Sequence, residues 1–569
     1  MNERYEKAKE LADKIDNDII EIFKQGYNFK VEAGAGSGKT YSLMKVLTWI
    51  KENNYFKYVK KGQKIACITY TNAAVNVIKE RLGENTFIIP CTIHSFAWDV
   101  IKKYQKELIG LILTNDMLPK DFDIEKDIIK KVSYELGVKY FDNGILYLFH
   151  NDVIELFSYM LNCHKFRVML ASQYPVIFID EYQDANEDII NQILKFFINE
   201  KALPSIQFGF FGDSWQTIYK NNKAIGKIDS ENIFEINKIV NFRSCPEIID
   251  CLNKIRPDLK QKSALEDGDG LVKVVHCNDY KGLRRSDRNF VGDLPPEEIK
   301  KRLNSIIKQF DKDSPPKVLM LTHKILANQQ DYINIYDKFG SGFKDNEDKL
   351  INFVANVLEP VIVSLSKNDV KGLYETLGTS RPPVLSQNHK LMWKKLNNTI
   401  QKSNNLTIFE MLKIIYESKI VPIPDDIINI YENMINNPLE KYNSKSTYEQ
   451  ISNIKYSEFE KAVTFLKPDS IFSTDHGVKG EEYDNVIFVI GKGWNLYDFE
   501  NMLVMDEDAR KQKVDAYERN RNLFYVGCSR PRKKLILLIT CELKNEFNNY
   551  LSHIFGENNI IAFNDYIDN

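Results

Sequence analysis

Short runs of apolar residues, each followed by polar turns, recur along this chain of 569 residues. Runs of this length are typical of strands that are buried on both faces of a parallel sheet. Helical spacing separates them, for example over Asn76–Leu82 and Asp188–Phe197. The alternation predicts α/β layers. The predicted strands are Ile65–Thr69, Val176–Ile179, Ile206–Phe211, Val318–Leu321, Val486–Ile490 and Leu535–Thr540.

Two stretches interrupt this alternation. Asp99–Arg167 is rich in lysine and has apolar residues at helical spacing, and the stretch from Ile333 to Phe465 is rich in Asn, Lys, Ile and Tyr with the same spacing. The chain is too long for one compact core. We therefore predict two α/β domains, each interrupted by a helical insertion.

Composition and charge narrow the class of protein. A hydrophobic content of 43% and a charged content of 27% are ordinary for a globular protein. Basic and acidic residues balance at 77 against 79, so a nucleic-acid contact requires a local groove. The polar N-terminus and the short apolar runs predict no secretion and no membrane insertion. The eight scattered cysteines predict reduced thiols in a cytoplasmic protein.

The segment VEAGAGSGKT, residues 31–40, has the pattern of a phosphate-binding loop. It stands between a strand-like start and the apolar helix Tyr41–Ile50. Glycines free the backbone, so that amide N–H groups can point at phosphate oxygens. Lys39 would reach the β- and γ-phosphates and Thr40 would hold Mg²⁺. The predicted nucleotide-binding residues are Ala33, Gly34, Ala35, Gly36, Ser37, Gly38, Lys39 and Thr40.

Two further patterns suit phosphoryl chemistry. The strand VIFID carries Asp180 and Glu181 to its carboxyl end, where one carboxylate can bind Mg²⁺ and the other can activate water. Arg243 and Arg530 lie beyond the first sheet, and an arginine from another domain can stabilise charge on the γ-phosphoryl group. Taken singly, each arginine also suits a surface ion pair.

Taken together, the motifs resemble the UvrD/Rep/PcrA group of superfamily 1 DNA helicases. Eight blocks occur in the order of that family, from Ala33 to Pro531. The blocks are AGAGSGKT, ITYTN, CTIHSF, DEYQD, GDSWQTIY, NFRS, TDHGVKGEEYD and RNRNLFYVGCSRP.

The resemblance implies two RecA-like domains, with residues 1–97 and 170–238 in the first and 239–332 and 467–569 in the second. Residues 98–169 and 333–466 would be the insertions. It implies that Gln216 senses the γ-phosphate, Phe242 stacks on adenine and Glu482 contacts the ribose. It also implies ATP and Mg²⁺ as cofactors and 3′→5′ movement on single-stranded DNA or a tailed duplex. The implied DNA track is Thr69, Tyr70, Asn72, Thr92, His94 and His476.

The chain departs from the pattern of the family in four places, and these departures make unwinding a weaker prediction than translocation or DNA-stimulated hydrolysis. Relatives have a glutamine upstream of the phosphate loop that reads adenine. Near its expected position this chain has Asn17–Asp18, and Gln25 lies too close to the loop to take that role. Lys220–Lys223 replaces a base-stacking aromatic step. Cys541–Lys544 and a helix follow the last block where relatives have a duplex-splitting hairpin. Both insertions are smaller than in the repair helicases.

Three functions are compatible with these observations. The first is a DNA-stimulated ATPase that translocates or unwinds, in repair or defence. The second is a regulatory ATPase, because the compact chain resembles the helicase subunit of the Gabija anti-phage system, which works beside an OLD-family nuclease. The third, a generic phosphate-loop NTPase such as a kinase, leaves the blocks beyond Asp184 unexplained.

Overall fold

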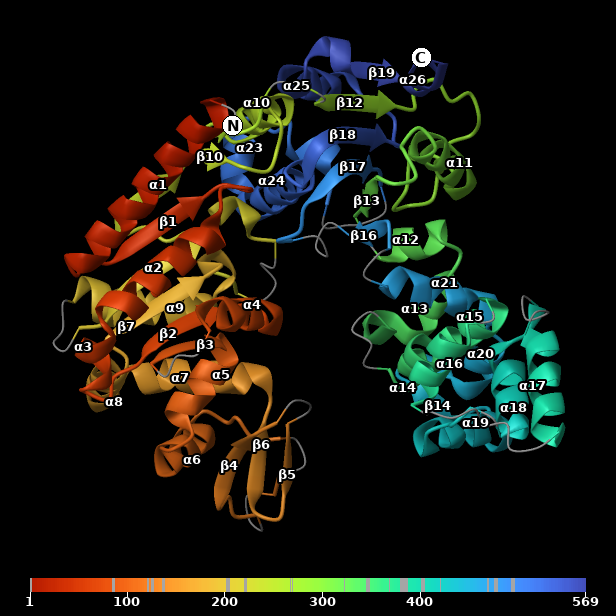
Figure 1. The fold of residues 1–569 in the computed structure, drawn as a ribbon, viewed down its shortest axis with the longest axis horizontal. Helices are drawn as coiled ribbons and strands as arrows, with labels where there is room; N and C mark the ends of the chain where they lie inside the picture. Colours follow the sequence, from red (N-terminus) through yellow and green to blue (C-terminus); the bar gives the residue numbers. More distant parts are fainter. Residues whose placement is uncertain are drawn as a thin grey trace.

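A computed structural model describes most of the chain. The described residues are 3–83, 87–119, 122–123, 127–135, 139–200, 205–218, 223–266, 268, 270–321, 323–343, 348–367, 369–378, 387–400, 405–419, 421–467, 470–474, 479–492 and 497–568. Among these residues lie two six-stranded parallel sheets, each covered by helices on both faces (Figure 1). The predicted α/β class with two parallel-sheet halves is confirmed.

The first sheet has the strand order β3-β2-β7-β8-β1-β9. Each of the six strand ranges predicted from apolar runs overlaps a strand of this sheet or of the second one. The strands of the first sheet are β1 (Phe29–Ala33), β2 (Ile65–Thr69), β3 (Ile88–Thr92), β7 (Val176–Asp180), β8 (Gln207–Gly212) and β9 (Phe234–Lys238). Its helices are α1 (Glu3–Lys24), α2 (Lys39–Asn53), α3 (Tyr55–Val59), α4 (Asn72–Leu82), α5 (Ile93–Ile101) and α9 (Glu187–Ile193).

The second sheet has the strand order β16-β13-β17-β18-β12-β19. Its strands are β12 (Leu271–His276), β13 (Lys317–Met320), β16 (Phe472–Thr474), β17 (Tyr483–Ile490), β18 (Pro531–Ile539) and β19 (Ile560–Ala562). Helices and a small ribbon surround it: α10 (Pro246–Ile255), α11 (Pro296–Ile307), α12 (His323–Gln329), α22 (Phe499–Met502), α23 (Glu507–Gln512), α24 (Val514–Cys528), α25 (Asn545–Phe555), α26 (Phe563–Asp568), β10 (Val240–Asn241) and β11 (Lys262–Ser263).

Both faces of each sheet are apolar, which explains why the strands read as continuous apolar runs. In β17, for example, Val486 and Phe488 pack toward one core and Ile487 and Val489 toward the other. Each insertion shares one of these cores: the cluster on one face of the first sheet extends into the first insertion, and the cluster containing Ile487 extends through the second. The residue boundaries of the four parts stay a prediction.

The first insertion is not purely helical, which corrects the prediction for Asp99–Arg167. Besides α6 (Gln105–Thr114), α7 (His150–Leu161) and α8 (His164–Gln173), it holds a three-stranded sheet of β4 (Lys131–Tyr134), β5 (Tyr140–Asp142) and β6 (Ile145–Leu148). Asn143 and Gly144 join β5 to β6 with positive φ values of 49° and 84°. An Asn-Gly pair with this backbone makes the tightest hairpin turn, so the sequence did carry the signal.

The second insertion is helical as predicted, apart from one short hairpin. In Figure 1 the two insertions extend away from the sheets as the two limbs of an arch. The helices are α13 (Ile333–Phe339), α14 (Lys349–Phe353), α15 (Glu359–Lys367), α16 (Val370–Leu377), α17 (Gln387–Ile400), α18 (Ile408–Ser418), α19 (Asp425–Asn436), α20 (Tyr448–Ser452) and α21 (Tyr456–Leu466), and the hairpin is β14 (Lys441–Asn443) with β15 (Ser446–Thr447).

One helical stretch, Lys349–Lys367, is long and apolar enough to cross a membrane by length and composition alone. Leu350, Phe353, Val354 and Leu358 of this stretch are buried in the core that the second insertion shares with the second sheet. The stretch is therefore a core helix of the insertion, and the cytoplasmic location stays a prediction.

All eight cysteines are free thiols, as the sequence predicts. Cys163 is exposed, Cys91 is half-buried, and the other six are buried. No group of three or more His, Cys, Asp or Glu side chains able to hold a metal ion occurs among the described residues.

Candidate nucleotide site and DNA track

The predicted phosphate loop connects the buried strand β1 to helix α2 (Figure 1). Gly36 and Gly38 have φ values of 73° and 75°, a left-handed conformation that glycine adopts at little cost. The loop thus turns sharply and begins α2 at Lys39, which places backbone N–H groups and a lysine at a helix N-terminus. Ser37 Oγ is buried without a hydrogen-bond partner among the described residues.

The second half of the protein contacts this loop directly. The amide of Phe242 donates to the Gly36 carbonyl at 2.9 Å, and Asn241 Nδ2 donates to the Ala35 carbonyl at 2.6 Å. The Tyr525 hydroxyl accepts a hydrogen bond from the Ala35 amide at 3.2 Å. The two halves are therefore closed against each other at the loop.

Close approach explains two of the glycines. A Cβ on Gly36 would lie 2.7 Å from Arg243 Cβ, and a Cβ on Gly34 would lie 2.7 Å from the side chain of Gln261. Gly34 has no left-handed backbone, so its role is to leave room for the facing half rather than to turn the chain.

Two carboxylates stand beside Lys39, at the end of β7. Lys39 Nζ lies 2.5 Å from Glu181 Oε1 and 4.0 Å from Asp180 Oδ1. Glu181 is the first residue after the strand and has a left-handed φ of 52°, which is strained for a residue with a side chain. Asp180 and Glu181, predicted as a pair from the sequence, thus lie next to the loop that was predicted with them.

Burial and mutual charge shape the protonation of this group. Burial raises the pKa of Asp180 to about 6. Burial acts in the same direction on Glu181, but the charges of Lys39 and Lys479 outweigh it and lower the pKa of Glu181 to about 2. For Lys39, the charges of Glu181 and Asp180 outweigh desolvation and raise the pKa. Glu181 is therefore ionised and held by Lys39 in this structure.

Gln216 is held from both halves. It lies in the turn η3 (Ser214–Gln216), and its Nε2 donates to Asp213 Oδ2 at 2.7 Å. From the second half, Arg530 NH2 donates to Gln216 Oε1 at 3.2 Å, and Lys479 Nζ donates to the Gln216 carbonyl at 2.8 Å. Lys479 also pairs with Asp184 of the first half.

The two predicted arginines are part of this closed interface. Arg530 is 1% exposed, and burial together with the charge of Arg243 lowers its pKa to about 9. An anion between the two guanidinium groups would relieve this repulsion. Arg243 donates through Nε to Glu482 Oε2 at 2.9 Å and through NH1 to the Ser529 carbonyl at 3.0 Å.

Phe242 and Glu482, the predicted adenine and ribose contacts, each contact other side chains of the protein in this structure. Phe242 packs against α1, with its ring 6.0 Å from that of Tyr5. Glu482 binds Arg243 and Arg532 instead. The structure brings Glu482 next to Arg243 and leaves Phe242 on the α1 side of the loop.

Three of the six predicted DNA residues line a cavity of about 790 Å³ at the carboxyl end of the first sheet. Thr69, Tyr70 and His94 line it together with Asp180 and Glu181, and α7 of the first insertion forms part of its wall. The track and the carboxylates therefore share one space.

The remaining track residues occupy helix starts. Asn72 begins α4, and Thr92 caps α5 by accepting a hydrogen bond from the Ser95 amide at 3.3 Å. Burial and the nearby His150 lower the pKa of His94 to about 4, so this imidazole is neutral. His476 lies outside the described residues, as do Lys220–Asn222 of the replaced stacking step.

Several interface residues were not identified from the sequence. Lys479 and Tyr525 lie inside two of the helicase-like blocks, TDHGVKGEEYD and RNRNLFYVGCSRP. These blocks marked the region as functional, although the sequence analysis assigned neither residue a role. Asn241 is the first residue of the block NFRS and carried the same signal. Gln261 and Arg256 lie outside all eight blocks, and nothing in the local sequence marks them.

The arrangement fits a nucleoside triphosphate with a divalent cation. The loop offers amide donors, Lys39 and the orphaned Ser37 hydroxyl, and Asp180 adds a hard oxygen ligand near Lys39. Mg²⁺ keeps waters and phosphate oxygens among its ligands, so a site with few protein ligands suits it.

Comparisons with known proteins agree with this geometry. Residues 17–222 match the family model AAA_19, described as an AAA domain. A Gabija protein GajB from Bacillus cereus (strain HuB5-5) is 26% identical over 95% of this chain and 97% of its own length. The resemblance to UvrD-like helicases is confirmed.

Two further relatives extend the comparison. A second Gabija protein GajB, from Bacillus cereus (strain VD045), is 23% identical over 94% of this chain and 97% of its own length. The mitochondrial ATP-dependent DNA helicase HMI1 of Saccharomyces cerevisiae is 28% identical over 44% of this chain and 41% of its own length. The helicase-like chain is thus similar to GajB proteins along nearly all of their length.

Proposed function

We propose that this protein is a DNA-stimulated ATPase that moves 3′→5′ along single-stranded DNA. One observation carries the proposal: Gln216, in the first half, is held by Asp213 of its own half and by Arg530 and Lys479 of the other. A side chain held in this way responds both to a bound phosphate and to the relative position of the halves.

The hydrolytic step starts from the Lys39–Glu181 ion pair. When phosphate oxygens draw Lys39 away, Glu181 loses its ion-pair partner and keeps the hydrogen bond from Gln183 to Oε2, so Oε1 can orient water and accept a proton. Mg²⁺ supplies positive charge opposite the phosphates, and Thr40 and Asp180 would hold it. Arg243 and Arg530 stabilise negative charge from the facing half.

Coupling to DNA follows from the shared cavity. Thr69, Tyr70 and His94 line the same space as Asp180 and Glu181, so a strand on the track borders the hydrolytic site. Asn72, Thr92 and His476 complete the proposed track. Phe242 would contact the adenine from the α1 side, and Glu482 would reach the ribose after releasing Arg243 or Arg532.

The test is ATP hydrolysis with and without single-stranded DNA, with Lys39→Ala as the blank. We expect strong stimulation by DNA in the wild type and background turnover in Lys39→Ala. Unstimulated hydrolysis would contradict the coupling, and unchanged turnover in Lys39→Ala would contradict the assigned site. A duplex with a 3′ tail then separates translocation from unwinding.

A second function, an ATPase that controls a partner nuclease in anti-phage defence, is favoured by a separate observation. The similarity to two GajB proteins spans nearly the full length of each. In addition, β18 leads through residues 540–544 directly into α25, where a duplex-splitting hairpin would stand. This proposal includes an OLD-family nuclease as the partner.

Co-purification of the two tagged proteins at endogenous expression tests this second function. A stable complex, with nuclease activity that changes between ATP and a non-hydrolysable analogue, would support it. A monomer that unwinds tailed duplexes without any partner would contradict it.

A further inference from the structure

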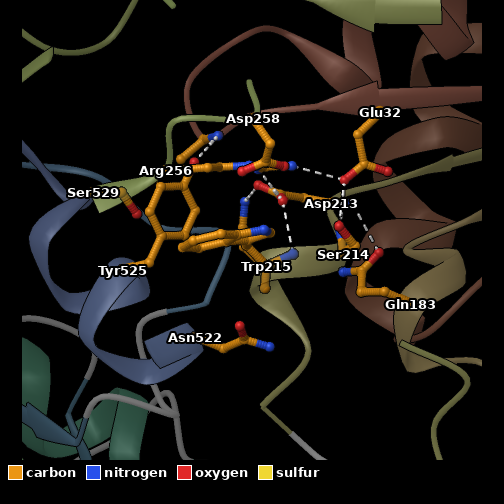
Figure 2. Close-up of polar contacts among 12 residues, drawn as sticks. Glu32, Gln183, Asp213, Ser214, Trp215, Arg256, Asp258, Asn522, Tyr525 and Ser529 are labelled. Atoms are coloured by element: carbon orange, nitrogen blue, oxygen red, sulfur yellow. Dashed lines mark hydrogen bonds and ion pairs between the residues drawn. The ribbon is translucent and has the colours of Figure 1, made fainter. Parts of the chain in front are cut away.

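A buried ion network links the halves and reaches Gln216 through its Nε2, whereas Arg530 contacts its Oε1. Its centre is Arg256, the residue that follows α10, with only 2% of its surface exposed. Figure 2 shows its side chain beside Tyr525 and Asp258 of the second half and reaching Asp213 and Glu32 of the first. Arg256 NH1 lies 2.5 Å from Asp213 Oδ1, and NH2 lies 2.9 Å from Glu32 Oε1.

The two acceptors are placed at the ends of adjacent strands that carry the nucleotide machinery. Glu32 belongs to β1 and directly precedes Ala33, where the phosphate loop begins. Asp213 directly follows β8, and its other oxygen, Oδ2, accepts from Gln216 Nε2 at 2.7 Å. Arg256 is therefore linked to the base of the loop through NH2 and Glu32, and to Gln216 through NH1 and Asp213.

Other contacts fix these carboxylates so that they transmit position. Ser214 donates to Glu32 Oε1 through its amide at 2.8 Å and its hydroxyl at 2.7 Å, and the Tyr182 hydroxyl donates to Glu32 Oε2 at 2.5 Å. The Trp215 amide donates to Asp213 Oδ1 at 3.1 Å. Glu32 Oε1 and Asp213 Oδ1, the two oxygens that Arg256 contacts, are thus also held by donors of the first half.

Trp215 lies within the same network and offers an optical signal. The Arg256 guanidinium is 5.5 Å from the Trp215 ring, and the Arg521 guanidinium of α24 is 4.0 Å from it. The Tyr525 ring is 5.8 Å away in an edge-on arrangement (Figure 2). A change in the separation of the halves must therefore change the surroundings of this indole.

We propose that Arg256 is a positioning residue that makes closure of the second half a condition for the hydrolytic placement of Gln216. The proposal rests on the proposed ATPase function. An ion pair inside one half would not tie Glu32, at the base of the phosphate loop, and Asp213, which holds Gln216, to the second half. Arg256 does so with two bonds from one planar group, a geometry that lysine cannot reproduce.

The protein supplies a matched control. Arg302 is also buried, with 5% of its surface exposed, and it also forks two carboxylates, Asp279 at 2.8 Å and Glu298 at 2.8 Å. All three residues belong to the second half, so this fork does not cross the interface. Arg256→Lys and Arg302→Lys therefore make the same chemical change in two buried forks, and only one of these forks joins the halves.

The experiment measures DNA-stimulated ATP hydrolysis and Trp215 fluorescence on addition of a non-hydrolysable ATP analogue, with Trp215→Phe to assign the signal. For Arg256→Lys we expect kcat to fall about tenfold or more with KM for ATP within about threefold, and the fluorescence change to be lost. Arg302→Lys should keep kcat and the fluorescence change even where its melting temperature falls equally. Equal kinetic effects in the two variants would overturn the proposal.

Two arms keep the test decisive. If Arg256→Lys does not fold, Glu32→Gln keeps the shape of one acceptor and removes its charge, and we expect kcat to fall about threefold at unchanged KM. An unchanged kcat would overturn the proposal. If the wild type hydrolyses no ATP, the proposed function fails, and the fluorescence change in wild type and Arg256→Lys still decides the role of Arg256.

Discussion

The two sheets of this protein have the same topology but different chemistry. If the strands of each sheet are numbered in chain order, both sheets read third, second, fourth, fifth, first, sixth. After the first strand of the first sheet comes the phosphate loop, with Lys39 at the start of α2. After the first strand of the second sheet come residues 277–295, with Lys281 exposed, before α11 begins.

The insertions also enter at different points. The first insertion lies between the third and fourth strands of its sheet, β3 and β7, and the second lies between the second and third strands of its sheet, β13 and β16. The common topology therefore fixes only a scaffold. What each half contributes depends on the loops at the strand ends: the groups that we propose bind phosphate in the first half, and arginines with closing contacts in the second.

The largest effect should come from equivalent lysines in the two halves. Lys39→Ala removes the charge that we propose faces the phosphates, and it should lower ATP hydrolysis by about 10⁴-fold or more. Lys281→Ala, in the loop after the corresponding strand of the second sheet, should leave it unchanged. Steady-state hydrolysis with saturating DNA measures both. A comparable loss in Lys281→Ala would break the distinction between the sheets.

The next effect separates two arginines of the second half. Arg530→Ala should lower kcat by about 10³-fold while nucleotide binding stays near that of the wild type, because the guanidinium acts on charge that develops during phosphoryl transfer. Arg532, which is half exposed and paired with Glu482, is the neighbouring control. Pre-steady-state hydrolysis and binding of a fluorescent analogue measure the two quantities. Weakened binding with normal turnover would assign Arg530 a different role.

A smaller effect concerns the contact that joins Asp184 to the second half. Lys479→Ala removes this pair and should lower the stimulation by DNA about tenfold, since one link between the track side and Gln216 is lost. Lys492, which pairs with Asp498 and Glu500 inside the second half, supplies the control Lys492→Ala. If both variants lose stimulation equally, the link between the halves is not the cause.

The smallest effect is on stability and its pH dependence. His94 has a pKa of about 4 in the folded protein, below its ordinary value of 6.5. Between these two pH values the unfolded chain therefore binds a proton at His94 and the folded chain does not. Stability from this residue is therefore present above pH 6.5 and is lost as pH falls toward 4. In His94→Asn, the free energy of unfolding should change with pH by about 1 kcal/mol less over this window than in the wild type; this figure allows for the solvent exposure of the ring.

Exposed His164 provides the comparison for that measurement, and His164→Asn should retain the slope of the wild type. Differential scanning calorimetry at several pH values resolves the difference. Equal slopes for His94→Asn and the wild type would show that the pKa of His94 is the same in the folded and unfolded protein.

Much of the fold could be predicted because buried parallel strands leave continuous apolar runs. Ile65–Thr69 was predicted to the residue, and Val486–Ile490 lies within β17. Strands with interrupted apolar patterns were not identified: β9 carries Glu235, Asn237 and Lys238. The small sheet in the first insertion was not predicted, because its strands are only three or four residues long and the Asn143–Gly144 turn is the clear hairpin signal between them.

The first half of the site was easier to predict than the second. Lys39, Asp180 and Glu181 stand in contiguous motifs whose residues act together in space. Arg256 depends on a contact across 224 positions of sequence with Glu32, and a single arginine after a helix has no distinguishing pattern. The repeated topology was also invisible, because two sheets can share a strand order without sharing residues.

The distribution of thiols makes this protein suitable for site-specific labelling in its natural sequence. Cys163 is exposed at the start of α8, and burial raises the pKa of half-buried Cys91 to about 12. A maleimide dye near neutral pH should therefore attach at one position in the first insertion. A second dye introduced on the opposite limb of the arch would then report, molecule by molecule, how the distance between the limbs changes during each catalytic cycle.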